Sequence, residues 1–364
     1  SYGTNLAKNL TQNGVTFGGA TLSIRVGDSA PKLVAGATGG TSQCRVCHSV
    51  AADGSRLVTQ HGDNSAISSS YDLTPTGATE TPMAIGAEFP GIYPDGSMAL
   101  APNGSLLPLP AAASPLAATG ITDSNVGTPA FSPDGKLVVM NPGGGTGQQL
   151  VGMDFDQSTL ALSNRRVVAD DTGGPATQRP GWGAFLPDNR SLVYHWQAGA
   201  TLNMAGDDKG PDPQGPDLRT RRGAKAQMWW TNLDGNASVT HLDKLNGVGY
   251  LPSLPTPNGL ACEADGHEVG SIDRTHSDDA NYNYEPTVNP IPGGGYAWVV
   301  FTSRRMYGNV ATIPPFCSDP RWADLKNNIT TKKLWVAAVD LSAAPGTDAS
   351  HPAFYLPGQE LLAG

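Results

Sequence analysis

The chain has 364 residues, of which 45 are Gly and 30 are Pro, whereas only 15% are charged and 38% are hydrophobic. Many turn-forming residues, together with enough apolar residues for a core, indicate short strands joined by turns and argue against a disordered chain. The net charge of −9 argues against a nucleic-acid-binding surface, which needs clustered Lys and Arg to neutralise phosphates.

The N-terminal part of the chain predicts strands and no membrane segment. The sequence begins at Ser1 without a hydrophobic leader, and no stretch approaches the roughly 18 apolar residues that a transmembrane helix needs. If the protein is exported, its leader has already been removed. The first strands are expected within residues 15–40, where the run 20–26 reads Ala-Thr-Leu-Ser-Ile-Arg-Val.

The next feature, Cys44-Arg45-Val46-Cys47-His48, is a C-x-x-C-H motif, the attachment signature of c-type haem. Two thiols at this spacing can each bond one vinyl group on the same edge of a porphyrin, and the adjacent His can then reach the iron. The alternatives are a redox disulfide pair, a zinc site and a structural disulfide. A redox pair normally lies in a βαβ unit and a closed zinc site needs two more nearby ligands, and neither context is present. The motif therefore predicts one covalent haem c at Cys44 and Cys47, with His48 as an axial ligand.

A repeated phrase, strand then Pro-Asp-Gly turn then strand, follows the motif and is clearest at 129–140. Copies or degenerate copies start at residues 48, 90, 129, 183, 252 and 286. Two of the intervals, 42 and 39 residues, match a four-stranded propeller blade, and the longer ones imply inserted loops, as at 200–225. We predict an all-β fold, a single β-propeller domain over residues 1–364 with blades in 44–360. The expected count is six antiparallel four-stranded blades, with five as the alternative because the copy at 252 is the weakest. The strands within 15–40 would complete the last blade and close the ring.

These phrases resemble the TolB-type propeller repeat, whose blades open with a Ser-Pro-Asp-Gly turn, and the resemblance covers roughly residues 44–360. The stretch 44–57 also looks like the haem-bearing first blade of exported TolB-type propeller proteins of environmental bacteria. The resemblance implies the fold and an exported protein. It implies no single activity, because propellers host enzymes, receptors and scaffolds alike.

The repeat also predicts where the haem lies. His48 occupies the position of Pro90, Pro129 and Pro286 at the start of an inner strand, and inner strands line the central channel. The haem is therefore expected on one face of the disc near its axis. His61, after the second strand of the same blade, and His276, before the last inner strand, are the candidates for the distal iron ligand.

Two other features concern the loops. Cys262 and Cys317 form an even remaining pair, and because c-type haem is attached outside the cytoplasm, a disulfide between them is expected. The insertion 207–217 carries four Asp residues that could bind calcium, but a solvated loop is the preferred interpretation.

Together these features predict an exported monohaem c-type cytochrome, periplasmic or at the cell surface, that exchanges electrons with a redox protein partner. One rival is a haem redox enzyme, such as a peroxidase or a small-oxyanion reductase, with an open iron position. The other rival is a binding or assembly module in which the haem is secondary, including a homo-oligomer that stacks haem on haem. The state of the iron would separate the first two functions.

Overall fold

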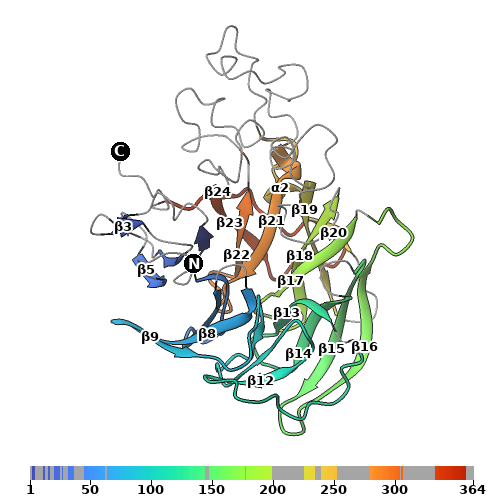
Figure 1. Ribbon diagram of the computed structural model, residues 1–364. Coiled ribbons are helices and arrows are strands. Elements are labelled where there is room, and N and C mark those ends of the chain that lie inside the picture. The colour runs from blue at the N-terminus through green and yellow to red at the C-terminus, as the bar shows by residue number, and fades with distance from the viewer. Residues whose placement is uncertain are drawn as a thin grey trace, which may run out of the picture.

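Figure 1 shows the computed structural model of the protein. The described residues are 2–4, 11–12, 15–16, 20–24, 27, 32–36, 45–61, 64–123, 125–143, 147–176, 178–198, 225–233, 239–251, 279–303, 305 and 333–357. The helices within these residues are too short to cross a membrane.

Five antiparallel sheets, in which each strand pairs with the next along the chain, form the blades of a propeller. The first blade consists of β6 (Val46–Val50), β7 (Arg56–His61), β8 (Asn64–Thr74) and β9 (Gly77–Pro82), and the second of β10 (Gly91–Ile92), β11 (Met98–Leu100) and β12 (Leu106–Pro108). The third consists of β13 (Val126–Phe131), β14 (Leu137–Pro142), β15 (Gln149–Asp156) and β16 (Ala161–Asp170). The fourth consists of β17 (Arg179–Phe185), β18 (Ser191–Ala198), β19 (Lys225–Asn232) and β20 (Thr240–His241), and the fifth of β21 (Asn283–Val288), β22 (Tyr296–Ser303), β23 (Lys333–Asp340) and β24 (Phe354–Tyr355).

The first strand of each blade is its inner strand, and the inner strands of successive blades contact one another: β10 with β6, β13 with β10, β17 with β13 and β21 with β17. This arrangement confirms the predicted all-β propeller. Within the described residues the propeller has five blades, the smaller of the two expected numbers. The repeat copy at 252 lies outside the described residues.

The N-terminal strands form two small sheets of their own. β4 (Ala20–Ser23) pairs with β1 (Tyr2–Thr4) and β5 (Lys32–Ala35), and β2 (Thr11–Gln12) pairs with β3 (Val15–Thr16). The three-stranded sheet contacts β6 and β9 of the first blade. Within the described residues, the last blade takes all its strands from 283–355, and β24 occupies its outer edge. The N-terminal strands were expected to complete this blade, but no described N-terminal strand pairs with it. That they help to close the ring stays a prediction.

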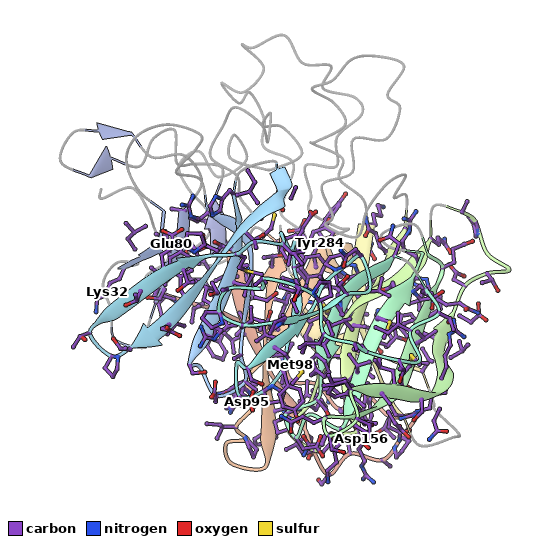
Figure 2. The ribbon with its side chains drawn as sticks, turned by 60° about the horizontal axis from the view of Figure 1, so that its bottom comes forward. Lys32, Glu80, Asp95, Met98, Asp156 and Tyr284 are labelled. Atoms are coloured by element: carbon purple, nitrogen blue, oxygen red, sulfur yellow. The ribbon has the colours of Figure 1, made fainter. Side chains whose placement is uncertain are left out.

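The repeated Asp-Gly phrases form hairpin turns between the first two strands of the blades. Asp53, Asp95, Asp134 and Asp188 each accept, through Oδ1, the backbone N–H two residues later. The third turn residue has positive φ, as in Gly96 at 72° and Asn189 at 62°, a conformation that Gly and Asn tolerate. Figure 2 shows Asp95 at the lower end of the propeller, together with Asp156, whereas Glu80 and Tyr284 lie toward the upper end.

The core consists of apolar clusters between neighbouring blades. Tyr93 of the second blade packs edge-to-face on Phe131 and Phe155 of the third, with ring centroids 5.4 and 5.8 Å apart. A larger cluster joins the fourth and fifth blades and includes Trp230, Phe301 and Trp335. Because each cluster is shared by two blades, apolar burial holds the ring together.

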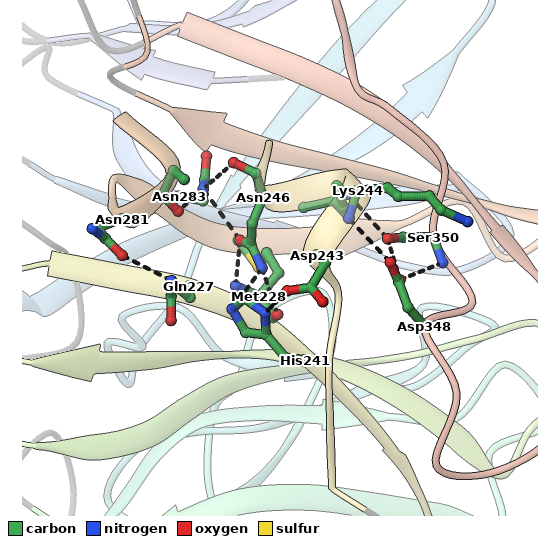
Figure 3. Close-up of polar contacts among 12 residues, drawn as sticks. Gln227, Met228, His241, Asp243, Lys244, Asn246, Asn281, Asn283, Asp348 and Ser350 are labelled. Carbon is green, nitrogen blue, oxygen red and sulfur yellow. Dashed lines mark hydrogen bonds and ion pairs between the residues drawn. The ribbon is translucent and has the colours of Figure 1, made fainter. Parts of the chain in front are cut away.

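A polar network fills the junction between the fourth and fifth blades next to the one-turn helix α2 (Asp243–Asn246) (Figure 3). The buried Asn246 side chain accepts from the Met228 N–H at 2.8 Å and donates to the Met228 carbonyl at 2.9 Å. His241 contacts Asp243 through Nδ1 and Asn246 through Nε2. The fully buried Arg305 donates to the carbonyls of Leu245 and Asn246 and to Asn283 Oδ1. We interpret this network as structural, because its groups satisfy one another and the backbone around α2.

Candidate functional site

Cys47 and His48 lie in a β-bulge of the innermost strand of the first blade. Val46 pairs with Gln60 and Ser49 with Val58, so Cys47 and His48 together oppose the single residue Thr59. A bulge of this kind inserts one extra residue, bends the strand and redirects its side chains. The sequence motif is thus placed where the inner strand departs from regular pairing.

The same irregularity recurs around the ring. Register shifts interrupt the pairing of β13 with β14 between Gly127 and Ala130, of β17 with β18 between Gly181 and Ala184, and of β21 with β22 between Tyr284 and Thr287. In every blade a non-Gly residue at this level has positive φ, and the five residues are Cys47 (52°), Phe89 (43°), Thr128 (39°), Trp182 (55°) and Glu285 (55°). We call them the bulge ring.

The bulge ring agrees with the alignment of the repeats made from the sequence. The residue after each ring member is His48, Pro90, Pro129, Gly183 or Pro286. Those are the residues at which the five corresponding repeat copies begin. The ring members are all half-buried, and the residues that follow them are buried in every blade except the first, where His48 is half-buried as well. Of the five residues that follow the ring members, His48 is therefore the most accessible to solvent.

A contact between Phe89 and Trp182 shows that these two side chains of the bulge ring extend toward the axis of the propeller. The rings of Phe89 and Trp182 meet edge-to-face with centroids 4.8 Å apart, although they belong to the second and fourth blades, which are separated by the third. Side chains of non-adjacent blades can meet only near the axis. The Phe89 N–H also donates to the Cys47 carbonyl at 3.3 Å, so the bulges of the first two blades adjoin.

Arg45, two residues before Cys47, is held by a polar cluster on the outer strands of the first blade. Its guanidinium contacts Glu80 Oε1 at 2.9 Å, and Arg45 Nε also donates to the Tyr71 hydroxyl at 2.9 Å. Burial raises the pKa of the Glu80 carboxyl, but hydrogen bonds from Ser69, Tyr71 and Arg45 outweigh it and hold that pKa below its ordinary value. Burial likewise raises the pKa of Tyr71, which keeps its hydroxyl protonated. The cluster ties the segment that carries the motif to β8 and β9.

His61 lies at the end of β7 that pairs with the start of β6, since the neighbouring Gln60 pairs with Val46. The structure thus places His61 at the same end of the first blade as Cys47 and His48. Its Nε2 lies 2.8 Å from Ser69 Oγ and 3.8 Å from Glu80 Oε1. Burial and the Arg45 charge lower the pKa of His61 despite the opposing Glu80 carboxylate. These contacts occupy Nε2, so only a turned ring or Nδ1 could serve as the distal ligand of an iron.

A second imidazole near the channel, His195, was not singled out from the sequence. It lies on β18 opposite Gly181, is fully buried, and accepts the Glu285 N–H at Nδ1 at 3.1 Å. Its ring centroid lies 6.3 Å from that of Trp182. A signal was present in the sequence, because His195, like His61, lies on the second strand of its blade.

Several predicted site residues lie outside the described residues. They are Cys44, the distal-ligand candidate His276, the expected disulfide partners Cys262 and Cys317, the inserted loop over most of 200–225, and the calcium candidate 207–217. Within the described residues, no group of three His, Cys, Asp or Glu side chains is placed to hold a metal ion.

Comparison with known proteins finds similar folds at low similarity. No protein-family model and no curated protein matches the chain. A protein assigned as TolB in Agrobacterium tumefaciens is 17% identical, with 59% of this chain and 70% of that chain covered and a TM-score of 0.40. Hydrazine synthase from Kuenenia stuttgartiensis is 11% identical, with 85% and 94% covered and a TM-score of 0.37. TolB from Acinetobacter baumannii is 13% identical, with 75% and 54% covered and a TM-score of 0.36. These values support no activity, and the propeller rests on the strand pairing described above.

Proposed function

We propose that the protein is an exported monohaem c-type cytochrome that transfers electrons from a propeller scaffold. The observation that carries the proposal is the C-x-x-C-H motif, whose Cys47 belongs to the bulge ring and whose His48 follows it in the same β-bulge of the inner strand. Cys44 and Cys47 would hold the porphyrin through thioether bonds, and His48 would be the axial ligand. The haem, when bound, supplies reversible one-electron chemistry at its iron.

The described residues fit this group in their chemistry. A thiol that becomes attached to a porphyrin must be accessible, and Cys47 is half-buried. The imidazole of an axial ligand must also be able to face a bulky group, and His48 is half-buried where its counterparts Pro90, Pro129 and Pro286 are buried. Among the five described blades, only the first has both the haem-attachment motif and a partly exposed residue at the position of His48.

The protein's own residues would set the properties of the centre. The Arg45–Glu80–Tyr71 cluster fixes the chain just before Cys47 and so restricts how the attachment segment can move. A rigid scaffold favours electron transfer, because little reorganisation accompanies the change of charge. Attachment of c-type haem outside the cytoplasm implies a periplasmic or cell-surface location, and we propose a redox protein as the partner.

The proposal is tested by visible and EPR spectra of the purified protein in both oxidation states, with His61→Ala, His276→Ala and the parent compared. A low-spin, six-coordinate iron that becomes high-spin in one variant supports electron transfer and identifies the distal ligand. His351→Ala is the matched control, because His351 packs on Tyr296 of the fifth blade, away from the bulge ring, and should leave the spectrum unchanged. A high-spin iron that binds cyanide freely in the parent would replace this function by that of a haem redox enzyme.

A further inference from the structure

The bulge ring brings two aromatic side chains next to the haem-attachment motif. We propose that Phe89 and Trp182 form an aromatic platform in the channel that contacts the haem attached at Cys47. This inference rests on the proposed function and adds to it the residues that cover one side of the porphyrin. It makes the centre of the propeller, rather than its outer surface, the binding surface for the cofactor.

The placement follows from the equivalence of Cys47, Phe89 and Trp182. All three have positive φ at the same level of the inner strand, so their Cα–Cβ bonds leave the backbone in related directions. Phe89 and Trp182 reach each other across the channel with ring centroids 4.8 Å apart. We infer the same direction for the Cys47 side chain, because Cys47 has the equivalent position in the first blade and its carbonyl accepts the Phe89 N–H.

Cys47 and Phe89 also lie next to each other along the bulge ring. The Phe89 N–H donates to the carbonyl of Cys47 at 3.3 Å, so the two residues are direct neighbours although they are 42 positions apart in sequence. Phe89 and Trp182 are both half-buried rather than enclosed in the core. An attached porphyrin would thus find exposed aromatic surface within reach of its attachment point.

The aromatic rings of Phe89 and Trp182 are better suited to contact a porphyrin than to contact water. A haem face is a large, flat apolar surface, and aromatic side chains bury such surface while gaining favourable stacked or edge-to-face contacts. The part of the two half-buried rings that stays in contact with water otherwise costs hydrophobic free energy. Covering the haem on one side would also limit water access to the iron, which is one way in which a protein sets a reduction potential.

The test uses the Soret-region circular dichroism of the full-length holoprotein, because this signal arises from coupling between haem transitions and those of nearby aromatic rings. The variants are Trp182→Phe and Phe89→Leu, which keep an apolar side chain of similar volume. The matched controls are Trp196→Phe and Phe131→Leu. Trp196 packs on Trp229 of the same blade, and Phe131 packs on Tyr93 and Phe155 between blades.

We expect both variants to lose a large part of the Soret dichroism and to shift the reduction potential, while both controls keep the parent's values. Haem content, measured by the pyridine haemochrome assay, should equal that of the parent, and if one variant fails to fold, the other decides. Full haem content with an unchanged Soret spectrum in Trp182→Phe and Phe89→Leu would overturn the aromatic platform and leave the cytochrome intact. Absence of covalent haem in the parent would instead overturn the proposed function, and the platform with it.

Discussion

Replacing Glu80 by Gln should destabilise the first blade more than breaking the Arg56–Asp72 ion pair of the same blade. The Arg45 side chain is only 8% exposed and its guanidinium lies 2.9 Å from Glu80 Oε1, so the substitution leaves a buried cation without its counter-charge. Hydrogen bonds to charged groups contribute about 1.5–3 kcal/mol, and Glu80 itself is 37% exposed, which places the expected loss near the lower end, at about 2 kcal/mol.

The matched control is Asp72→Asn, which breaks the Arg56–Asp72 pair at 2.7 Å in the same blade. Asp72 is 51% exposed, and exposed pairs contribute about 0–1 kcal/mol because water and salt screen them. Denaturant unfolding followed by tryptophan fluorescence compares the unfolding free energies of both variants with that of the parent. Equal losses in the two variants, or no loss in Glu80→Gln, would refute the assignment of the Arg45 cluster as the anchor of the attachment segment.

Two further predictions concern other blades. A Cβ added at Gly91 would lie 2.7 Å from the Pro129 carbonyl oxygen, whereas a Cβ added at Gly77 would meet nothing within 4 Å. Gly91→Ala should therefore lower the unfolding free energy by about 2 kcal/mol or more, and Gly77→Ala by well under that, as thermal unfolding would show. Similar melting points of the two variants would contradict the close packing of β10 on β13. Burial raises the pKa of the Asp154 carboxyl, but hydrogen bonds from Asn164 and Arg166 and the positive charge of Arg166 outweigh it and lower that pKa. The ionised carboxylate therefore stabilises the fold above its ordinary pKa, and this contribution is lost as the pH falls through the lowered pKa. The stability advantage of the parent over Asp154→Asn should therefore shrink on acidification, and a difference in melting temperature that grows below about pH 4 would contradict the ion pair.

The propeller and the placement of the motif could be predicted because they depend on repetition. Each Pro-Asp-Gly phrase marks a hairpin that the structure forms, and the phrases align His48 with Pro90, Pro129 and Pro286. Such local signals identify the inner strands without any knowledge of the ring. The end of the first blade at which His61 lies followed from the same alternation of strands and turns.

The contacts around the motif could not be predicted, because they depend on how the ring closes. Nothing in the sequence shows that Phe89 and Trp182 meet, since this requires both the positive φ of the bulges and the curvature that brings the second and fourth blades together near the axis. Arg45 and Glu80 are 35 residues apart and meet only when β9 pairs with β8. The pairing of β4 with β1 and β5 could not be predicted either, because their short runs carry no turn phrase of the repeat, and their part in closing the ring stays a prediction.

The most direct test of the cytochrome assignment is the intact mass of the protein after co-expression with a c-type haem maturation system and extraction with acidified acetone. We expect the parent to retain the added mass of one haem, Cys47→Ser and Cys44→Ser to retain less or none, and Cys262→Ser, which changes a cysteine outside the motif, to retain it in full. A parent protein that carries no added mass, or a haem that acid extraction removes, would contradict covalent attachment of a haem at the motif.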